Sequence, residues 1–331
     1  MNIGNITISV IIPVYNASVT LPHCLESLHK QTYRNLELLF VDDCSTDESL
    51  YILTSYAEQF AEIDFTIRIL QHERNRGVAA ARNTALKCAT GDYIYYVDAD
   101  DSIEPHTLEC LVNEINHKGL DIVGHEWYLT FNSNARYMKQ PAYTTSVEAL
   151  RKMGGVMRWN LWLFLVRRSL YVENDIRFTE GLNMGEDMMV MMKLFICAGK
   201  VGIVHRPFYH YRQSNPESLT KIYSQEHIIQ VANNVYEVEK YVNASAYADS
   251  LIEFIPFLKL NIKLPLLITD DKSHYEQWLE CFPEANCYVM NNKLLPLRTR
   301  IIQWMAVKRY FILLRLYYRT VFKLVYGIIY K

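Results

Sequence analysis

The sequence predicts an α/β fold, with a mostly parallel, Rossmann-like sheet that has helices on both faces, followed by a helical C-terminal region. Two observations carry this prediction: strand-like and helix-like segments alternate four times within residues 9–97, and polar residues follow several of the strand-like segments. Such alternation is typical of parallel strands joined by crossover helices. The 331 residues, half of them hydrophobic, suffice for one large α/β domain with an additional part.

Four short apolar runs predict the strands, and the segments between them predict helices. Each run is rich in β-branched or aromatic residues and ends in polar ones, as expected of buried strands. The predicted strands span residues 9–14, 36–41, 65–70 and 93–97. The predicted helices span residues 21–31, 45–57 and 77–88, and Ser45 or Thr46 is expected to cap the second of them.

Polar side chains come directly after three of these strands. Tyr15 and Asn16 follow the first, Asp42 and Asp43 follow the second, and an acidic cluster at residues 98–101 follows the fourth. In sheets of this kind, ligands bind beyond the carboxyl ends of the strands. The sequence therefore predicts a ligand site at this edge of the sheet.

The pattern is looser after residue 105. Helices are predicted over residues 108–117, 187–198 and 224–241, a strand over 121–124, and a loop-rich segment over 132–145. The chain is accordingly divided into an α/β domain at residues 7–215, a helical region at 216–296 and a basic tail at 297–331.

Composition restricts the partners and the compartment. The formal net charge of −2 gives no reason to expect nucleic acid as a partner. Seven scattered cysteines without a C-x-x-C pair indicate reduced thiols in the cytoplasm rather than disulfides or a zinc site. The N-terminus lacks the pattern of a signal peptide, and no uncharged apolar run is long enough to predict a spanning helix.

The acidic cluster contains Asp98, Asp100 and Asp101. Carboxylates this close repel one another unless a cation or hydrogen-bond donors compensate them. Mg²⁺ or Mn²⁺ prefers such oxygen ligands and would bridge them to a diphosphate. The alternative is a solvated acidic turn that caps the next helix. The position after a buried aromatic strand, opposite Asp42 and Asp43, favours the metal site.

Five motifs in order resemble glycosyltransferase family 2, the bacterial inverting enzymes with the GT-A fold. They are SVIIPVYN at residues 9–16, VDDCSTD at 41–47, NRGVAAARN at 75–83, GDYIYYVDADD at 91–101 and GED at 185–187. Each motif alone is weak, whereas the ordered set is specific and covers about residues 7–215. The resemblance implies a sugar-nucleotide-dependent transferase with a GT-A catalytic domain over this range.

The resemblance also implies roles for the residues at the strand ends. Pro13 and Tyr15 would border the nucleobase and Asp43 would hydrogen-bond it, whereas Asp42 would have a structural part at this turn. Asp98 would contact the ribose or the metal shell, and Asp100 would coordinate the divalent metal. The additional Asp101 leaves this register open by one residue.

Two arginines are assigned to the nucleotide in the same way. Arg82 would lie near the nucleotide, and its alternative is an ordinary ion pair on a helix surface. Arg212 would contact the diphosphate from a segment at residues 205–220 that resembles the one covering this group in the family.

The GED motif supplies the expected catalytic carboxylates. Asp187 would be the general base that takes the proton of the acceptor hydroxyl during in-line attack, and Glu186 would orient its neighbour or the acceptor. The alternative is that both simply favour the start of a helix, where carboxylates are stabilised.

Other classes of protein fit less well. A dinucleotide oxidoreductase would have G-x-G-x-x-G after the first strand, and a P-loop kinase would have G-x-x-x-x-G-K-[ST]; neither motif is present. A sugar-nucleotide-binding protein or a nucleotidyltransferase with a related sheet stays an alternative. The preferred function is transfer of a sugar, expected to be UDP-linked, to a glycan or lipid-linked acceptor in cell-envelope or exopolysaccharide synthesis.

The C-terminal tail has no Asp or Glu after Glu284, while nine Lys or Arg residues follow it. Lys308, Arg315, Arg319 and Lys323 are spaced seven, four and four residues apart, which predicts one basic stripe on a helix over residues 300–331. A basic, apolar-faced helix suits the anionic inner face of the cell membrane, so peripheral membrane contact is expected. The alternative is a helix docked on the protein with its basic stripe in solvent.

Overall fold

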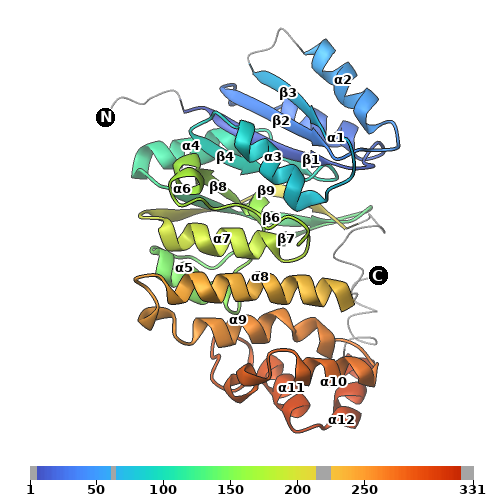
Figure 1. The fold of residues 1–331 in the computed structure, drawn as a ribbon, viewed down its shortest axis with the longest axis vertical. Coiled ribbons are helices and arrows are strands. Elements are labelled where there is room, and N and C mark those ends of the chain that lie inside the picture. The colour runs from blue at the N-terminus through green and yellow to red at the C-terminus, as the bar shows by residue number, and fades with distance from the viewer. Residues whose placement is uncertain (1–5, 61–64, 214–224, 322–331) are drawn as a thin grey trace. The chain divides into compact units, whose positions relative to one another are not determined.

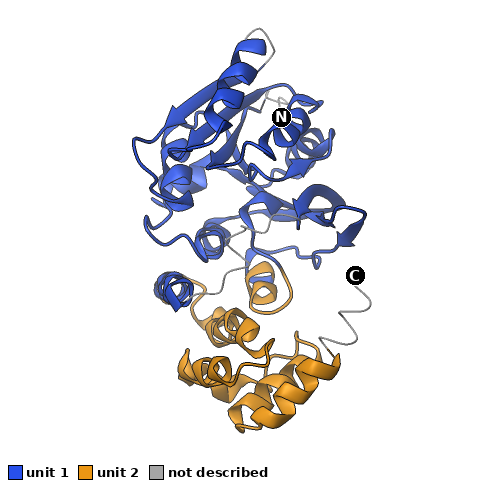
Figure 2. Cartoon of the chain, turned by 90° about the vertical axis from the view of Figure 1, so that its right-hand side faces the viewer, with its two compact units in different colours: residues 1–148, 158–242 blue, residues 149–157, 243–331 orange. Residues whose placement is uncertain are grey.

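The computed structural model describes residues 6–60, 65–213 and 225–321. The chain divides into two compact units (Figure 2): unit 1 comprises Met1–Glu148 and Arg158–Val242, and unit 2 comprises Ala149–Met157 and Asn243–Lys331. The predicted boundaries after residues 215 and 296 stay predictions, and the first of them lies outside the described residues.

Unit 1 is built on a sheet whose order is β3-β2-β1-β4-β8-β6-β9-β5, with β7 paired to β6. Its strands are β1 Ile8–Val14, β2 Leu36–Asp42, β3 Thr66–Gln71, β4 Tyr93–Tyr96, β5 Ser102–Ile103, β6 Ile122–Thr130, β7 Ala135–Met138, β8 Phe164–Arg167 and β9 Val201–Arg212. The predicted α/β class is confirmed.

The four N-terminal strands lie side by side and are parallel, as predicted (Figure 1). Right-handed crossovers from β1 to β2 and from β2 to β3 place α1 Leu21–His29 and α2 Ser49–Gln59 on one face. The crossover from β3 to β4 runs in the opposite direction, so α3 Val78–Cys88 covers the other face. The carboxyl ends of these strands therefore meet at one edge of the sheet.

The later strands make the sheet mixed rather than parallel throughout. β8 is antiparallel to both β4 and β6, and β5 and β7 are antiparallel to their partners, whereas β6 and β9 are parallel. β7 lies inside the segment 132–145 that was expected to be loop.

The helices of unit 1 also include α4 Thr107–Lys118, α6 Arg168–Glu173, α7 Glu186–Cys197 and α8 Gln225–Asn243, while α5 Ser146–Met153 spans the boundary of the units. The predicted helices of unit 1 begin and end within a few residues of their predicted positions, whereas the sequence did not predict α5 and α6. The predicted cap of α2 is wrong, because α2 begins after Glu48 without a side-chain cap. Ser45 Oγ instead accepts from the N–H of Asn16, which joins the loops after β1 and β2.

The described part of unit 2 is helical. Its α-helices are α9 Phe254–Ile262, α10 Lys272–Glu280, α11 Leu297–Val307 and α12 Phe311–Tyr317. Lys263, fully buried after α9, donates hydrogen bonds to the carbonyls of Cys281 and Phe282 and to Asn286 Oδ1, and its Nζ lies 4.1 Å from the centre of the Trp278 ring. One side chain thus joins the end of α9 to the turn after α10.

The prediction of one continuous helix over residues 300–331 is wrong. Arg309 takes a left-handed conformation with φ 57° and separates α11 from α12. Its N–H donates to the Ala306 carbonyl and the N–H of Tyr310 donates to the Met305 carbonyl, which is the Schellman pattern of helix termination. Arginine occupies the position where glycine is usual, so no sequence signal marked the stop. Lys323 and Lys331 lie outside the described residues.

Candidate active site

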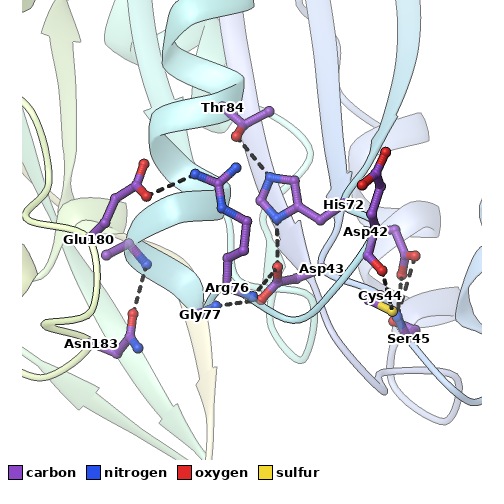
Figure 3. A network of polar contacts seen from close by, with 12 residues as sticks. Asp42, Asp43, Cys44, Ser45, His72, Arg76, Gly77, Thr84, Glu180 and Asn183 are labelled. Carbon is purple, nitrogen blue, oxygen red and sulfur yellow. Dashed lines mark hydrogen bonds and ion pairs between the residues drawn. The ribbon is translucent and has the colours of Figure 1, made fainter.

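The turn after β2 brings Asp42 and Asp43 to the edge of the sheet (Figure 3). Asp42 Oδ1 and Oδ2 lie 3.3 and 3.4 Å from the N–H of Ser45, which donates to them. This contact stabilises the turn, as expected for Asp42.

Asp43 is buried and accepts three hydrogen bonds. Its Oδ1 is 2.6 Å from His72 Nδ1 and 2.9 Å from the N–H of Arg76, and its Oδ2 is 2.7 Å from the N–H of Gly77. His72 is itself held by Thr84, at 2.8 Å from Nε2 to Oγ1. Asp43 therefore ties the turn after β3 to the start of α3, whatever else it binds (Figure 3).

The loop before α7 contacts the same turn. Arg76 pairs with Glu180 at 2.8 Å, and Asn183 Oδ1 accepts from the N–H of Ala79 at 3.1 Å, in the first turn of α3. Gly77 has φ 84°, which favours glycine, and a Cβ there would meet Asn183 Nδ2 at 2.3 Å and would displace that side chain. The start of α3 and the loop leading to Asp187 are one packed structure.

Arg82, on α3, joins three carboxylates. Its Nη1 lies 2.7 Å from Glu186 Oε1 and 2.7 Å from Asp187 Oδ1, and its Nη2 lies 3.2 Å from Asp98 Oδ1. Arg82 is buried, and its Cζ lies over the Tyr96 and Phe178 rings, 6.0 and 5.7 Å from their centres. Arg82 is therefore not an ordinary ion pair on a helix surface, because it is buried and binds acidic residues of two motifs. That it lies near the nucleotide stays a prediction.

The charges of this cluster are unbalanced. Burial alone would lower the pKa of Arg82, but Asp187, Asp98 and Glu186 hold it above its usual value. Burial and the neighbouring Asp187 raise the pKa of Glu186. Burial likewise raises the pKa of Asp98, against the opposing effect of Arg82 and with the support of Asp187 and Asp100. One cation therefore compensates the acidic side chains only in part.

Asp101 has a structural role, because both of its carboxylate oxygens bind groups of β9. Its Oδ2 accepts from the Tyr209 hydroxyl at 2.9 Å and its Oδ1 accepts from the N–H of Arg212 at 2.7 Å, both on β9. Asp101 is also buried, while Asp98 and Asp100 are partly exposed. The two partly exposed carboxylates are thus spaced as Asp98-Ala99-Asp100, which favours this register over one shifted to the buried Asp101.

These two carboxylates fit a hard divalent cation. Burial is the main cause of the raised pKa of Asp98, with Asp187 and Asp100 adding to it, and a bound cation would favour the charged form of this carboxylate. Within residues 6–60, 65–213 and 225–321, no three His, Cys, Asp or Glu side chains form a ready metal site. Mg²⁺ commonly binds through one or two carboxylates, with water and substrate phosphate as its other ligands.

The remaining predicted residues lie around the same edge. Pro13 is near the end of β1 and Tyr15 follows it with half of its surface exposed. Arg212 lines a cavity of about 270 Å³ together with His23, Lys30 and His210. Its backbone contact with Asp101 places Arg212 beside the acidic cluster.

Three residues of this site gave no signal in the sequence. His72 holds Asp43, Asn183 caps α3, and Tyr209 holds Asp101 while accepting from the N–H of Asp98. Asn183 and Tyr209 contact residues about a hundred positions away, such as Ala79 and Asp101. Local patterns cannot reveal such pairs.

Comparison with known proteins gives consistent results. The model of the family "Glycosyl transferase family 2" matches residues 9–193. The chain is 32% identical over 223 residues to the "Uncharacterized glycosyltransferase EpsJ" of Bacillus subtilis (strain 168), a match covering 65% of this chain and 63% of EpsJ. It is 30% identical over 207 residues to the poly(ribitol-phosphate) beta-N-acetylglucosaminyltransferase TarS of Staphylococcus aureus (strain Mu50 / ATCC 700699), covering 61% of this chain and 35% of TarS.

A solved structure shares the fold. The crystal structure of S. aureus TarS 1-349 in complex with UDP-GlcNAc aligns with a TM-score of 0.71 at 21% identity, over 95% of this chain and 91% of that one. The GT-A-type fold expected from the motifs is confirmed by this likeness.

Proposed function

The chain belongs to glycosyl transferase family 2, and on that premise we propose that it transfers a sugar from a UDP-linked donor to a glycan or lipid-linked acceptor, with inversion at the anomeric carbon. We further propose that this reaction belongs to cell-envelope or exopolysaccharide synthesis, since the name of the relative TarS gives a polymer, poly(ribitol-phosphate), together with a sugar transfer. The observation that carries the proposal is the guanidinium of Arg82, which joins Asp98 of the acidic cluster to Asp187 of the GED motif.

The nucleobase would lie between the loops after β1 and β2. Tyr15 offers an exposed ring and Pro13 an apolar border. A carboxylate has about four acceptor positions, and Asp43 uses three of them within the protein. One position is left for an N–H of the base, so Asp43 can both fix the turn and bind the nucleotide.

Asp98 and Asp100 would hold a divalent metal, Mn²⁺ or Mg²⁺, and Arg212 would add positive charge from the end of β9. When bound, such an ion stabilises the negative charge of a departing diphosphate. Asp101 keeps the acidic loop in place through Tyr209 and the backbone of Arg212, which is why we assign the metal to the two partly exposed carboxylates.

Asp187 would act as the general base. It stands in the first turn of α7, with Oδ1 bound to Arg82 and Oδ2 3.4 Å from the N–H of Leu161. These contacts fix its orientation, while part of its side chain stays exposed to accept a proton from an acceptor hydroxyl. Glu186 is more buried and bound to the same guanidinium, which suits an orienting role.

The reaction would take place in the cytoplasm. All seven cysteines are free, as expected in a reducing compartment. Among the described residues, no helix has the length and apolarity needed to cross a membrane.

The deciding experiment is a donor screen. UDP- and GDP-sugars are incubated with the full chain and with lipid-linked or free glycan acceptors, and nucleotide release is measured with Mn²⁺, with Mg²⁺ and with EDTA. We expect release from a UDP-sugar, dependent on metal and acceptor, and a product of inverted anomeric configuration by NMR. Asp187→Asn should lower turnover by roughly 10²–10⁴-fold, with UDP affinity retained.

Asp175→Asn is the matched control, because Asp175 is an exposed carboxylate paired with Arg177 at the surface. It should keep full turnover. Near-normal turnover of Asp187→Asn would place the base elsewhere. UDP binding without any turnover would favour a sugar-nucleotide-binding protein, and release of pyrophosphate from a sugar phosphate and UTP would favour a nucleotidyltransferase.

A further inference from the structure

Exposed apolar side chains gather on the last two described helices of unit 2. Ile312 is 83% exposed and Leu316 57%, values far from those of core residues. We call this set the apolar ridge; it consists of Leu294, Leu297, Ile301, Trp304, Tyr310, Ile312, Leu313 and Leu316. Large exposed apolar patches mark interaction sites, and these exposed side chains lie close together in the chain.

The ridge continues across the break between α11 and α12. Leu297, Ile301 and Trp304 follow one another at spacings of four and three residues, so they share one face of α11. The Trp304 ring packs edge-on against the Tyr310 ring at 5.7 Å and so reaches the start of α12. Ile312, Leu313 and Leu316 continue it on that helix.

The ridge is not the core-facing side of these helices. Ile302, Ala306 and Leu314 are the buried residues there, and the buried Gln303 donates to the carbonyl of Leu260 on α9. Both α11 and α12 therefore pack on the rest of unit 2 through faces other than the apolar ridge. Docking of these helices on the protein, the alternative considered above, explains those buried faces but not the exposed ridge.

Basic side chains accompany the ridge. Arg298, Lys308, Arg309, Arg315 and Arg319 are all exposed. Arg319 lies 3.4 Å from Asp270, a long contact between two half-exposed side chains. No Asp or Glu occurs in the sequence after Glu284, so these helices carry no acidic residue of their own.

We propose that the apolar ridge and these basic residues dock unit 2 on an anionic phospholipid bilayer, with α11 and α12 lying in the interface. Apolar side chains enter the boundary between headgroups and acyl chains, while Lys and Arg attract anionic headgroups. In the described part of the chain α12 has seven residues, and no helix there is long and apolar enough to cross a membrane. A second copy of the chain is a poorer occupant, since its own ridge would bring like charges together.

This inference concerns unit 2 alone and does not depend on the catalytic roles proposed for unit 1. Flotation of the full chain with vesicles provides the test, with phosphatidylcholine alone compared with phosphatidylcholine and phosphatidylglycerol at 7:3. Each Lys or Arg near the surface contributes about a fivefold factor in binding. We therefore expect at least a tenfold higher partition into the anionic vesicles at 0.1 M NaCl, and loss of most of this difference at 1 M NaCl.

Two variants separate the apolar and the basic contributions. Ile312→Ser with Leu313→Ser and Leu316→Ser should lower the partition at least tenfold, and so should Lys308→Gln with Arg309→Gln and Arg315→Gln. The matched controls are Ile252→Ser, 77% exposed in the same unit but outside the ridge, and Lys87→Gln with Lys118→Gln and Arg177→Gln on exposed positions of unit 1. Neither control should change the partition by more than about twofold.

Absence of flotation with anionic vesicles at low salt would overturn the proposal. Equal binding to uncharged vesicles, or a dimer that the serine variant abolishes without any vesicle binding, would overturn it as well. UDP affinity of each variant is measured by calorimetry and should equal that of the unmodified chain. A failure of the donor screen would leave the vesicle results unaffected, so the two proposals fail separately.

Discussion

Arg82 Nη1 lies 2.7 Å from Asp187 Oδ1, and the same guanidinium reaches Asp98 Oδ1 through Nη2 at 3.2 Å. The buried side chain of Arg82 therefore fixes the positions of both Asp98, in the acidic cluster, and Asp187, the proposed base. Arg82 is a positioning residue in this arrangement, since it would act on the reaction through the two carboxylates.

Replacement of Arg82 by lysine should separate positioning from charge. Lys keeps the positive charge but cannot hold three carboxylates with a planar fork. We expect kcat to fall by about 10²-fold through misplacement of Asp187, while the UDP dissociation constant changes by a few-fold at most. Steady-state kinetics and calorimetry measure the two quantities. Arg177→Lys, in an exposed pair, is the control and should change neither.

Asp43→Asn should weaken both the fold and donor binding. The Asp43 carboxylate accepts hydrogen bonds from the N–H groups of Arg76 and Gly77 and from His72 Nδ1. In the variant, the amide NH₂ would face at least one of these donors and could not accept from it. We expect a loss of about 1–3 kcal/mol in the free energy of unfolding and a roughly tenfold weaker UDP affinity. Asp42→Asn is the control, because the contacts of the Asp42 side chain to the N–H of Ser45 are long, at 3.3 and 3.4 Å. Unchanged UDP affinity in Asp43→Asn would count against the nucleotide site.

His125 should make unit 1 sensitive to mild acid. Burial lowers the pKa of this fully buried side chain from 6.5 to about 4. The unfolded chain then binds a proton that the folded chain does not, so stability is complete above pH 6.5 and is lost as the pH falls towards 4.

The expected loss from His125 is about 2 kcal/mol between pH 7 and pH 5, measured as the shift of the guanidinium chloride midpoint at the two values. Because other groups titrate as well, the comparison is with His125→Gln, which should show a smaller shift. Identical pH dependence of the two proteins would mean that His125 is not held neutral in the fold.

Lys263→Met should destabilise unit 2. The substitution keeps the length of the side chain but removes the donor shared by the carbonyls of Cys281 and Phe282 and by Asn286. Acceptors left without a donor in the interior cost about 1–3 kcal/mol, which thermal unfolding and limited proteolysis of the 281–286 turn would reveal. Lys272→Met, in an exposed pair with Glu276, should cost less than about 0.5 kcal/mol.

The sequence predicts well what depends on local pattern. The four parallel strands, α3, α7 and the grouping of polar residues at the strand ends were all accessible, because burial imposes period and composition on each segment. The ordered motifs then identified the family. They could not predict which groups hydrogen-bond Asp43, or which of Asp98, Asp100 and Asp101 has a structural role.

What the sequence did not predict depends on contacts between distant residues. Asp101 is committed to the fold only because Tyr209 and the backbone of Arg212 come from a strand more than a hundred residues later. The stop at Arg309 was missed for the opposite reason: it is local, but the residue that takes the left-handed conformation is not glycine or asparagine.

The number of residues between Gly77 and Arg82 is constrained more strongly than the identity of their side chains. Gly77 at the start of α3 is fixed by Asp43, and Arg82 in its second turn is fixed by Asp187. Each residue advances a helix by about 100° and 1.5 Å, so inserting or deleting one residue between them would turn Arg82 away from its carboxylates. Exchange of Val78 or Ala80 for another small residue leaves that phase intact. We therefore expect a library of variants to accept substitutions between Gly77 and Arg82 and to reject every change in their number.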